Sequence, residues 1–173
     1  MSSDEYTYRA GTIKDKAELK ELTILSYSPF TTLLNAEHAN KLTATLKDEK
    51  RMDALIANSK SFVCIYQNKI VGMAFIVPHG NPWEIFKAEW SYIRMLGVHP
   101  DYQGNGIGKK LTQMCITFAK ENKESIIALH TSEFMNAARH LYESLGFKKS
   151  KEIEPRFGKK YWLYLLELDK QNL

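Results

Sequence analysis

The fold of this chain is decided by the stretch Val98-His99-Pro100-Asp101-Tyr102-Gln103-Gly104-Asn105-Gly106-Ile107-Gly108-Lys109-Lys110. An apolar run that begins at Trp90 predicts a strand leading into this stretch, and apolar residues at helical spacing follow it. Its glycines allow positive φ angles and close backbone approach, and a helix N-terminus favours an anion. The stretch is therefore predicted to be a strand, a turn and a helix, whose turn either binds a phosphate group or is a simple tight turn.

The glycine spacing argues against two common nucleotide-binding motifs. A P-loop requires G-x-x-x-x-G-K-[ST], whereas Gly104 and Gly108 are closer together and Lys110 stands where Ser or Thr should bind a metal. A dinucleotide-binding motif places G-x-G-x-x-G directly after a strand, whereas here Pro100 and other residues separate Val98 from the first glycine. An ATP- or GTP-binding protein is therefore disfavoured.

The length, composition and net charge are those of an ordinary soluble domain. We expect residues 1–173 to form one domain, since 44% of the residues are hydrophobic and 25% are charged. The net charge of +4 suits a small anionic ligand and is too small to indicate a nucleic-acid partner. Cys64 and Cys115 lie in apolar runs, which predicts buried free thiols and no metal site. Without a signal pattern or a membrane-length apolar run, we expect a cytoplasmic protein with no membrane partner.

The order of apolar patterns predicts an α/β fold, with a mixed central sheet of about 6–7 strands flanked by about four helices. The predicted strands are 6–10, 62–66, 70–77, 90–98, 126–129 and 161–168. The predicted helices run from Thr12 to before Pro29, across 36–58 with a break near 47–49, from Ile107, and up to a C-terminal stop at Gly146 and Phe147. Residues 148–160 are predicted to be a strand end plus a hairpin loop. Trp83 and Phe86 are predicted to form either a packing anchor or a substrate-facing lid.

A second motif occurs in the last predicted helix, Asn136-Ala137-Ala138-Arg139-x-Leu141-Tyr142-Glu143-x-x-Gly146-Phe147. Together with Gln103-x-x-Gly106-x-Gly108, this motif resembles the GCN5-related N-acetyltransferase (GNAT) superfamily, over about half of the chain. Two motifs in the right order and at the right separation are much more specific than either one alone. The resemblance implies a single-domain GNAT-like fold. It also implies an enzyme, an acyl-CoA-dependent N-acyltransferase that moves acetyl from acetyl-CoA to a primary amine by direct attack.

The resemblance also implies which residues bind acetyl-CoA. Backbone N–H groups of the turn would hold the pyrophosphate, and exposed backbone of the central strand would pair with the pantetheine arm. Gly97 would permit a bulge or close approach there, or simply pack. Asn136 would contact the arm or cap its helix, and Arg139 would reach the phosphates or lie in solvent. The expected cofactor-binding residues are Leu96, Val98, Gln103, Gly104, Asn105, Gly106, Ile107, Gly108, Lys109 and Asn136.

Tyr142 is the expected general acid. A thiolate leaving group has a thiol pKa of about 8.5 and needs a proton donor, and a tyrosine phenol is protonated at neutral pH. The alternative for Tyr142 is a purely structural core aromatic. Backbone N–H groups near Val98 would hold the thioester oxyanion. No general base is evident, because Tyr92 falls at or near the position where some relatives carry a glutamate. The remaining base candidates are Glu84, Glu89, His130 and a water relay.

The sequence does not identify the acceptor substrate. We expect it to be a small-molecule amine or a protein or peptide amino group, recognised by residues 27–58, 78–89 and 148–160, which carry no recognisable motif. The basic 148–160 segment either favours an acidic partner or is a solvated surface. A homodimer is left open. The competing function is a non-catalytic domain that binds coenzyme A for regulation, which would bind the cofactor without turnover.

Overall fold

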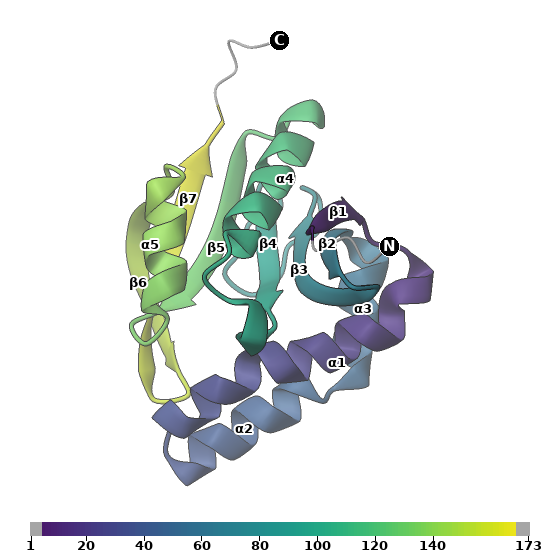
Figure 1. The fold of residues 1–173 in the computed structure, drawn as a ribbon. Helices are drawn as coiled ribbons and strands as arrows, with labels where there is room; N and C mark the ends of the chain where they lie inside the picture. The colour runs from purple at the N-terminus through teal and green to yellow at the C-terminus, as the bar shows by residue number, and fades with distance from the viewer. Residues whose placement is uncertain (1–4, 169–173) are drawn as a thin grey trace.

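A seven-stranded sheet in the order β1-β2-β3-β4-β5-β7-β6 organises residues 5–168, the part of the chain that this computed structural model describes (Figure 1). The strands are β1 (Thr7–Ala10), β2 (Lys60–Tyr66), β3 (Lys69–Val77), β4 (Ser91–Val98), β5 (Ile126–Ser132), β6 (Lys148–Arg156) and β7 (Lys159–Glu167). The helices are α1 (Lys16–Tyr27), α2 (Ala36–Leu46), α3 (Glu49–Asn58), α4 (Ile107–Glu121) and α5 (Asn136–Ser144). Short 3-10 turns cover Ile13–Asp15, Ser28–Leu33 and Pro100–Tyr102. The predicted mixed α/β sheet is confirmed.

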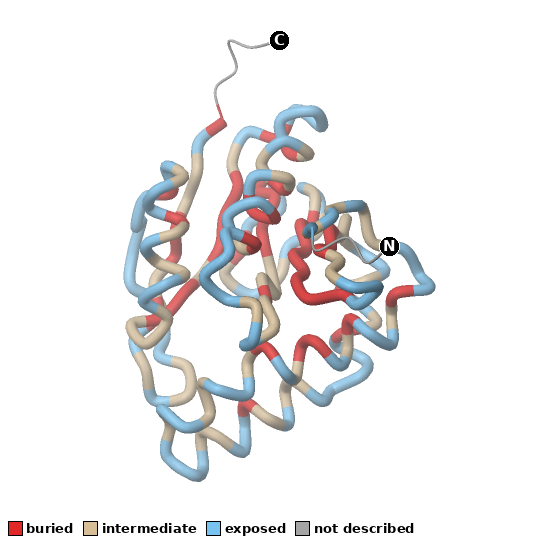
Figure 2. Tube along the Cα trace, in the orientation of Figure 1, coloured by how far each residue is buried: buried red, intermediate tan, exposed pale blue. Residues whose placement is uncertain are grey.

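Helices cover both faces of the sheet, and each face has its own hydrophobic cluster. On one face, Ile107, Leu111 and Cys115 of α4 pack with Tyr142 of α5 and with Phe147. On the other face, apolar residues of α1 and α3 pack against the sheet, namely Leu19, Leu22, Met52 and Leu55. Figure 2 shows that buried residues concentrate along the central strands, whereas β6 is mostly exposed and α2 is a mixture of exposed and half-buried residues. The sheet therefore forms the middle layer of three.

The two central parallel strands, β4 and β5, pair only at their beginnings. Ser91 lies opposite Ile127 and Tyr92 opposite Ala128, and no further pairs between the two strands exist within residues 5–168. Beyond Tyr92 the strands diverge, because β4 then follows β3 alone. The backbone edge of β4 that faces β5 is consequently left without a partner strand. This divergence creates the space for the site described below.

A β-bulge distorts β4 inside the divergent segment. Met73 pairs with Gly97 and Phe75 with Arg94, so two residues of β4 lie opposite one of β3. Met95 has a φ of 56°, which locates the irregularity at Met95 rather than at Gly97. The close approach expected at Gly97 is made by α1, since a Cβ there would lie 2.5 Å from Ser26 Oγ.

Two segments required the structure to define them. Residues 36–58 form two helices, because Asp48 caps α3 by accepting a hydrogen bond from Arg51 N at 3.3 Å. The strand end and hairpin expected over 148–160 are present, but the strand is longer and the loop shorter than expected, since β6 continues to Arg156 and a two-residue turn at Phe157 and Gly158 (φ 54° and 71°) leads into β7. The difference has a physical cause: β6 is an edge strand with exposed side chains, so its sequence lacks an apolar alternation.

The expected stop of α5 is confirmed. Gly146 has a φ of 98°, and its N–H donates to Glu143 O, while Phe147 N–H donates to Tyr142 O. This pair of hydrogen bonds is the Schellman motif, and it brings the Phe147 and Tyr142 rings to a centroid distance of 5.7 Å. The stop thereby fixes the end of the helix that carries Tyr142.

Candidate active site

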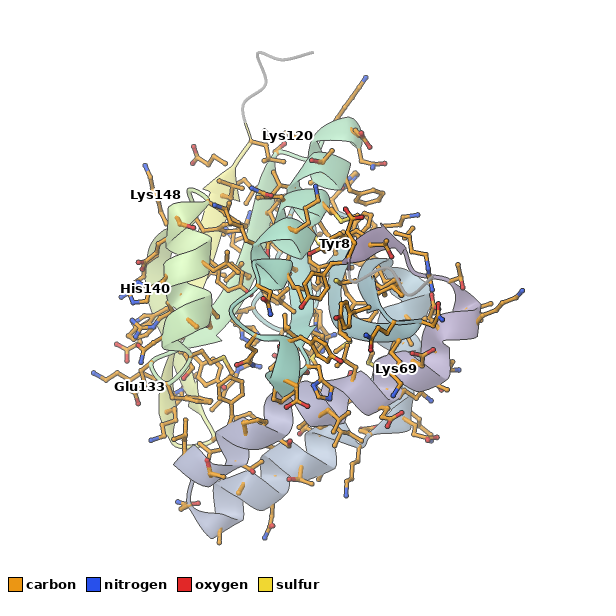
Figure 3. The ribbon with its side chains drawn as sticks, in the orientation of Figure 1. Tyr8, Lys69, Lys120, Glu133, His140 and Lys148 are labelled. Atoms are coloured by element: carbon orange, nitrogen blue, oxygen red, sulfur yellow. The ribbon has the colours of Figure 1, made fainter. Side chains whose placement is uncertain are left out.

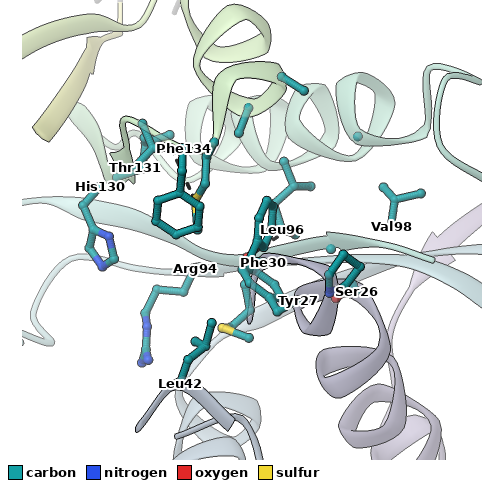
Figure 4. Close-up of a pocket in the computed structure, with 18 of the residues that line it drawn as sticks. Ser26, Tyr27, Phe30, Leu42, Arg94, Leu96, Val98, His130, Thr131 and Phe134 are labelled. Carbon is teal, nitrogen blue, oxygen red and sulfur yellow. Dashed lines mark hydrogen bonds between the residues drawn. The ribbon is translucent and has the colours of Figure 1, made fainter. Parts of the chain in front are cut away.

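A cavity of about 1260 Å³ occupies the space between the diverging strands. It is lined by β4, β5, the Gly-rich turn, the start of α5, and parts of α1 and α2 (Figure 4). The tip of the β6–β7 hairpin closes one side, because a Cβ at Gly158 would lie 2.9 Å from His38 Nε2 of α2. Segments far apart in the sequence thus meet around one cavity.

The Gly-rich turn presents free backbone donors to this cavity. Gly104 and Gly106 have φ angles of 83° and 75°, and a Cβ on either would meet no protein atom within 4 Å. Gly106 is the N-cap of α4 and offers no side-chain cap, and Lys110 N donates to Gly106 O at 3.1 Å. The N–H groups of the residues between them have no helical acceptor. A pyrophosphate fits this turn, since donors, helix dipole and open space coincide there.

Most of the expected cofactor-binding residues line the cavity. These residues are Leu96, Val98, Gln103, Gly104, Gly106, Ile107, Gly108, Lys109 and Asn136. The Ile107 side chain is only 2% exposed and packs in the core, so this residue has only its backbone to offer a ligand. Asn105 is absent from the cavity lining within the described part of the chain. Its Nδ2 instead donates to Tyr102 O at 2.9 Å and stabilises the turn.

Asn136 and Arg139 interact with each other at the start of α5. Asn136 does not cap the helix, since the N-cap is Met135, and its Oδ1 accepts a hydrogen bond from Arg139 Nη2. Arg139 lies over the Trp162 ring, 5.3 Å from its centroid, and is not part of the cavity lining in residues 5–168. A phosphate contact by Arg139 therefore has no support in this geometry.

The exposed edge of β4 is partly occupied by Tyr27. His99 N donates to Val71 O of β3, so the alternate residues Val98 and Leu96 direct their backbone groups to the open edge. The Tyr27 hydroxyl, at the end of α1, donates to Leu96 O at 2.8 Å. The N–H of Leu96 and both backbone groups of Val98 then remain for an extended, amide-bearing ligand.

Tyr142 is a buried residue of the cavity lining. Its side chain is 6% exposed, lines the cavity and packs in the core that α4 and α5 share. Burial raises the pKa of Tyr142 well above its usual value, so the phenol is protonated at neutral pH. Burial likewise raises the pKa of the thiol of Cys115, which lies in the same core as Tyr142.

The base candidates differ in position. Glu84 and His130 line the cavity, whereas Glu89, among the described residues, does not. Burial, with help from Arg156 and Arg94, lowers the pKa of His130 to about 3. Moving a proton to such a group from an alkylammonium of pKa 10.4 costs about 10 kcal/mol, which argues against His130 as the base.

Tyr92 and Phe86 have structural roles beside the cavity. Tyr92, at the position of the glutamate in some relatives, donates its hydroxyl to Asn81 O at 2.9 Å and stacks on Phe86. Phe86 is 2% exposed and is a packing anchor, whereas Trp83 lines the cavity. The packing-anchor alternative therefore applies to Phe86, and Trp83 faces the cavity.

Two cavity residues were not singled out from the sequence, although Tyr27 lies within the 27–58 segment expected to recognise the acceptor. Tyr27 follows an ordinary helical pattern before Pro29, and Arg94 is one charged residue inside an apolar strand. An isolated arginine in an otherwise apolar strand is a usable signal for a polar site, because such a residue is rarely buried without a partner. Tyr27 carries no comparable signal.

Residues 23–147 match the family model described as the acetyltransferase (GNAT) family. The match covers most of the chain, so this protein belongs to the GNAT family of acetyltransferases. Among curated relatives, it is 35% identical over 81 residues to the L-amino acid N-acyltransferase MnaT of Escherichia coli, a region that is 43% of this chain and 46% of MnaT. It is 34% identical over 93 residues to the N-acetylaspartate synthetase of Xenopus tropicalis, which is 54% of this chain and 32% of that protein. The chain thus aligns with about a third to a half of the length of these relatives.

Solved structures share the fold over almost the whole chain. The PaiA N-acetyltransferase of Thermoplasma acidophilum in complex with coenzyme A superposes with a TM-score of 0.75 at 13% identity, covering 95% of this chain and 99% of that one. The acetyltransferase yncA of Salmonella typhimurium with its cofactor acetyl-CoA gives 0.68 at 20% identity, covering 97% and 96%. The GNAT-like fold is therefore confirmed.

Proposed function

We propose that this protein transfers an acetyl group from acetyl-CoA to a primary amine. One observation carries the proposal: the uncapped N-terminus of α4 opens into the same cavity as the unpaired edge of β4 and the buried Tyr142. A pyrophosphate, an extended amide arm and a thioester occur in that order in acetyl-CoA. The turn, the strand edge and the tyrosine all line this one cavity, which supports binding of the whole cofactor there.

Different residues would bind the cofactor, stabilise the developing charge and donate the proton. The N–H groups of the turn from Gly104 to Lys109 bind the pyrophosphate, and the backbone of Leu96 and Val98 aligns the arm. Acetyl-CoA, when bound, supplies an activated acyl group. The backbone N–H groups near Val98 stabilise the negative charge that develops on the carbonyl oxygen. Tyr142 donates a proton toward the departing sulfur. No side chain is assigned as the base, and a water relay to backbone carbonyls would accept the proton of the amine.

The acceptor is a small-molecule amine or an amino group of a protein or peptide. Support for both kinds comes from relatives, since one is named an L-amino acid N-acyltransferase and another is the N-alpha-acetyltransferase 30 of Schizosaccharomyces pombe. We also propose that residues 1–173 form one domain.

The two free, buried cysteines support a reducing, cytoplasmic location. None of the helices within residues 5–168 is long and apolar enough to cross a bilayer. A homodimer stays a prediction.

Coenzyme A release in the presence of an amine panel tests this function. The proposal predicts thiol release that depends on both acetyl-CoA and an amine. The panel should include amino acids, polyamines, aminoglycosides and peptides with free N-termini. Tight binding of acetyl-CoA without release in any of these mixtures would instead support the non-catalytic coenzyme A-binding domain.

A further inference from the structure

The end of the cavity away from the Gly-rich turn carries an arginine without an acidic partner. Arg94 of β4 lines the cavity there, and Figure 4 shows it and His130 extending away from Val98. None of the ion pairs within residues 5–168 includes Arg94. The one glutamate that lines this end, Glu84, is paired instead with Arg156, at 2.5 Å.

Arg94 is held in place by an aromatic face. Its guanidinium carbon lies 3.8 Å from the centroid of the Trp83 ring, and Arg51 approaches the same ring at 5.8 Å. Stacking on an indole fixes the plane of the guanidinium and leaves its edge N–H groups free to donate. The donors are thus positioned before any ligand arrives.

The charge balance of this end is positive. Burial lowers the pKa of Arg94 below its usual value, and the charge of Arg51 adds to the effect. The charged guanidinium has therefore lost part of its hydration. Glu84 pairs with Arg156 and acts on Arg94 only from a longer distance, so Arg51, Arg94 and Arg156 share a single carboxylate at this end. A desolvated guanidinium gains most from a carboxylate, which can accept two parallel hydrogen bonds.

The position of Arg94 on β4 relates this end to the reacting group. Tyr92 packs with the cluster under α1, and Ile93 with the cluster under α4. The bulge at Met95 then breaks the alternation, so Leu96 packs toward α4 while Arg94 shares the side of Trp83. Arg94 is two residues from Leu96, roughly 7 Å along the strand. A short molecule bound to Arg94 can therefore reach the end of an arm aligned on Leu96.

From this juxtaposition we propose that the acceptor is a small amine that carries a carboxylate close to its nitrogen, as in an amino acid, and that Arg94 binds this carboxylate. The proposal rests on the acetyltransferase function proposed above and names its substrate class. The carboxylate gives Arg94 its missing partner and directs the amine toward the thioester. A peptide N-terminus offers a neutral amide at the same place and leaves Arg94 unpaired.

The test compares amino acids with their amides, which lack this charge, and the rates are referred to the deprotonated amine because the amide also has the less basic amine. We expect kcat/KM for coenzyme A release to be roughly 10- to 100-fold higher for the acid than for the amide, because the free energy of a hydrogen bond to a charged group corresponds to a factor of that size. Arg94→Gln should remove the difference, and Arg94→Lys should restore part of it. Arg139→Gln is the matched control, because Arg139 also stacks on a tryptophan but lies outside the cavity lining.

The outcomes separate this inference from the proposed function. Equal rates for acids and amides, or an acid preference that survives Arg94→Gln, would overturn the carboxylate site and leave the acetyltransferase intact. If no amine is acetylated although acetyl-CoA binds, the function itself fails. In that case calorimetry of an amino acid with the protein–coenzyme A complex decides the site: binding lost in Arg94→Gln supports it, and no binding overturns it. Thermal unfolding of each variant establishes that it is folded.

Discussion

Ser26 of α1 packs directly onto Gly97 of β4, in the segment where β4 leaves β5. A Cβ at Gly97 would lie 2.5 Å from Ser26 Oγ, 3.1 Å from Ser26 Cβ and 3.2 Å from Met73 Cε. The next residue of α1, Tyr27, donates its hydrogen bond to Leu96 O. The helix therefore holds the unpaired edge of β4 through two neighbouring contacts.

Gly97→Ala should destabilise the protein by about 1–3 kcal/mol, the usual cost of overpacking a close contact. The double variant Gly97→Ala/Ser26→Ala should recover part of that loss, because it removes the atom in the shortest contact. Urea denaturation of the two single variants and the double variant measures this coupling. Additive effects would show that Ser26 and Gly97 do not interact as described.

Gly106→Ala should reduce the affinity for acetyl-CoA strongly while costing only about 1–2 kcal/mol of stability. The stability cost comes from a positive φ in a residue with a Cβ, and the affinity loss comes from a methyl group placed in open space at the turn. Gly80→Ala is the matched control, since Gly80 also has a positive φ (91°) and open space, but lies outside the cavity lining. Calorimetry that finds equal affinity in the two variants would argue against the turn as the pyrophosphate site.

Tyr142→Phe should lower kcat and leave the affinity for acetyl-CoA nearly unchanged, because only the proton donor is removed. Tyr164→Phe removes a hydroxyl from the same core, where it donates to Glu143 Oε1 at 2.9 Å. That control should lose about 1 kcal/mol of stability without a change in kcat. Steady-state kinetics with chemistry as the slow step distinguish the two, and an unchanged kcat in Tyr142→Phe would exclude it as the acid.

His130 should make the folded state less stable in acid. Its pKa is about 3 in the folded protein and about 6.5 in an unfolded chain. The unfolded chain therefore binds more protons between these values, and the stability falls as the pH drops from 6.5 toward 3, by at most about 1.4 kcal/mol per pH unit. In His130→Gln this contribution is absent, so its free energy of unfolding should depend less steeply on pH. Parallel pH curves for the two proteins would show that His130 is not buried in its neutral form.

The regular parts of the fold were predictable because each has a local cause. Gly146 needs a positive φ at a helix end, and the apolar spacing after Gly106 defines α4. The edge strand β6 was not predictable in the same way, since its exposed face carries basic residues such as Lys148, which extends outward in Figure 3. The lysines of β6 are exposed and lie outside the cavity lining.

The site was predictable where a motif fixes backbone geometry, and not where distant segments meet. The Gly-rich turn and Tyr142 are both in motifs, and the structure brings them to one cavity. Arg94, Trp83 and Tyr27 come together only through the bulge in β4 and the approach of α1, which are properties of the tertiary fold. The acceptor end of the cavity therefore needed the structure.

A structure of the protein with acetyl-CoA bound is the decisive measurement. We expect the pyrophosphate on the N–H groups from Gly104 to Lys109, the arm along Leu96 and Val98, and the thioester sulfur within hydrogen-bond reach of the Tyr142 hydroxyl. Acetyl-CoA bound outside the β4–β5 divergence would rule out this cavity as the cofactor site, and a sulfur remote from Tyr142 would rule out Tyr142 as the acid.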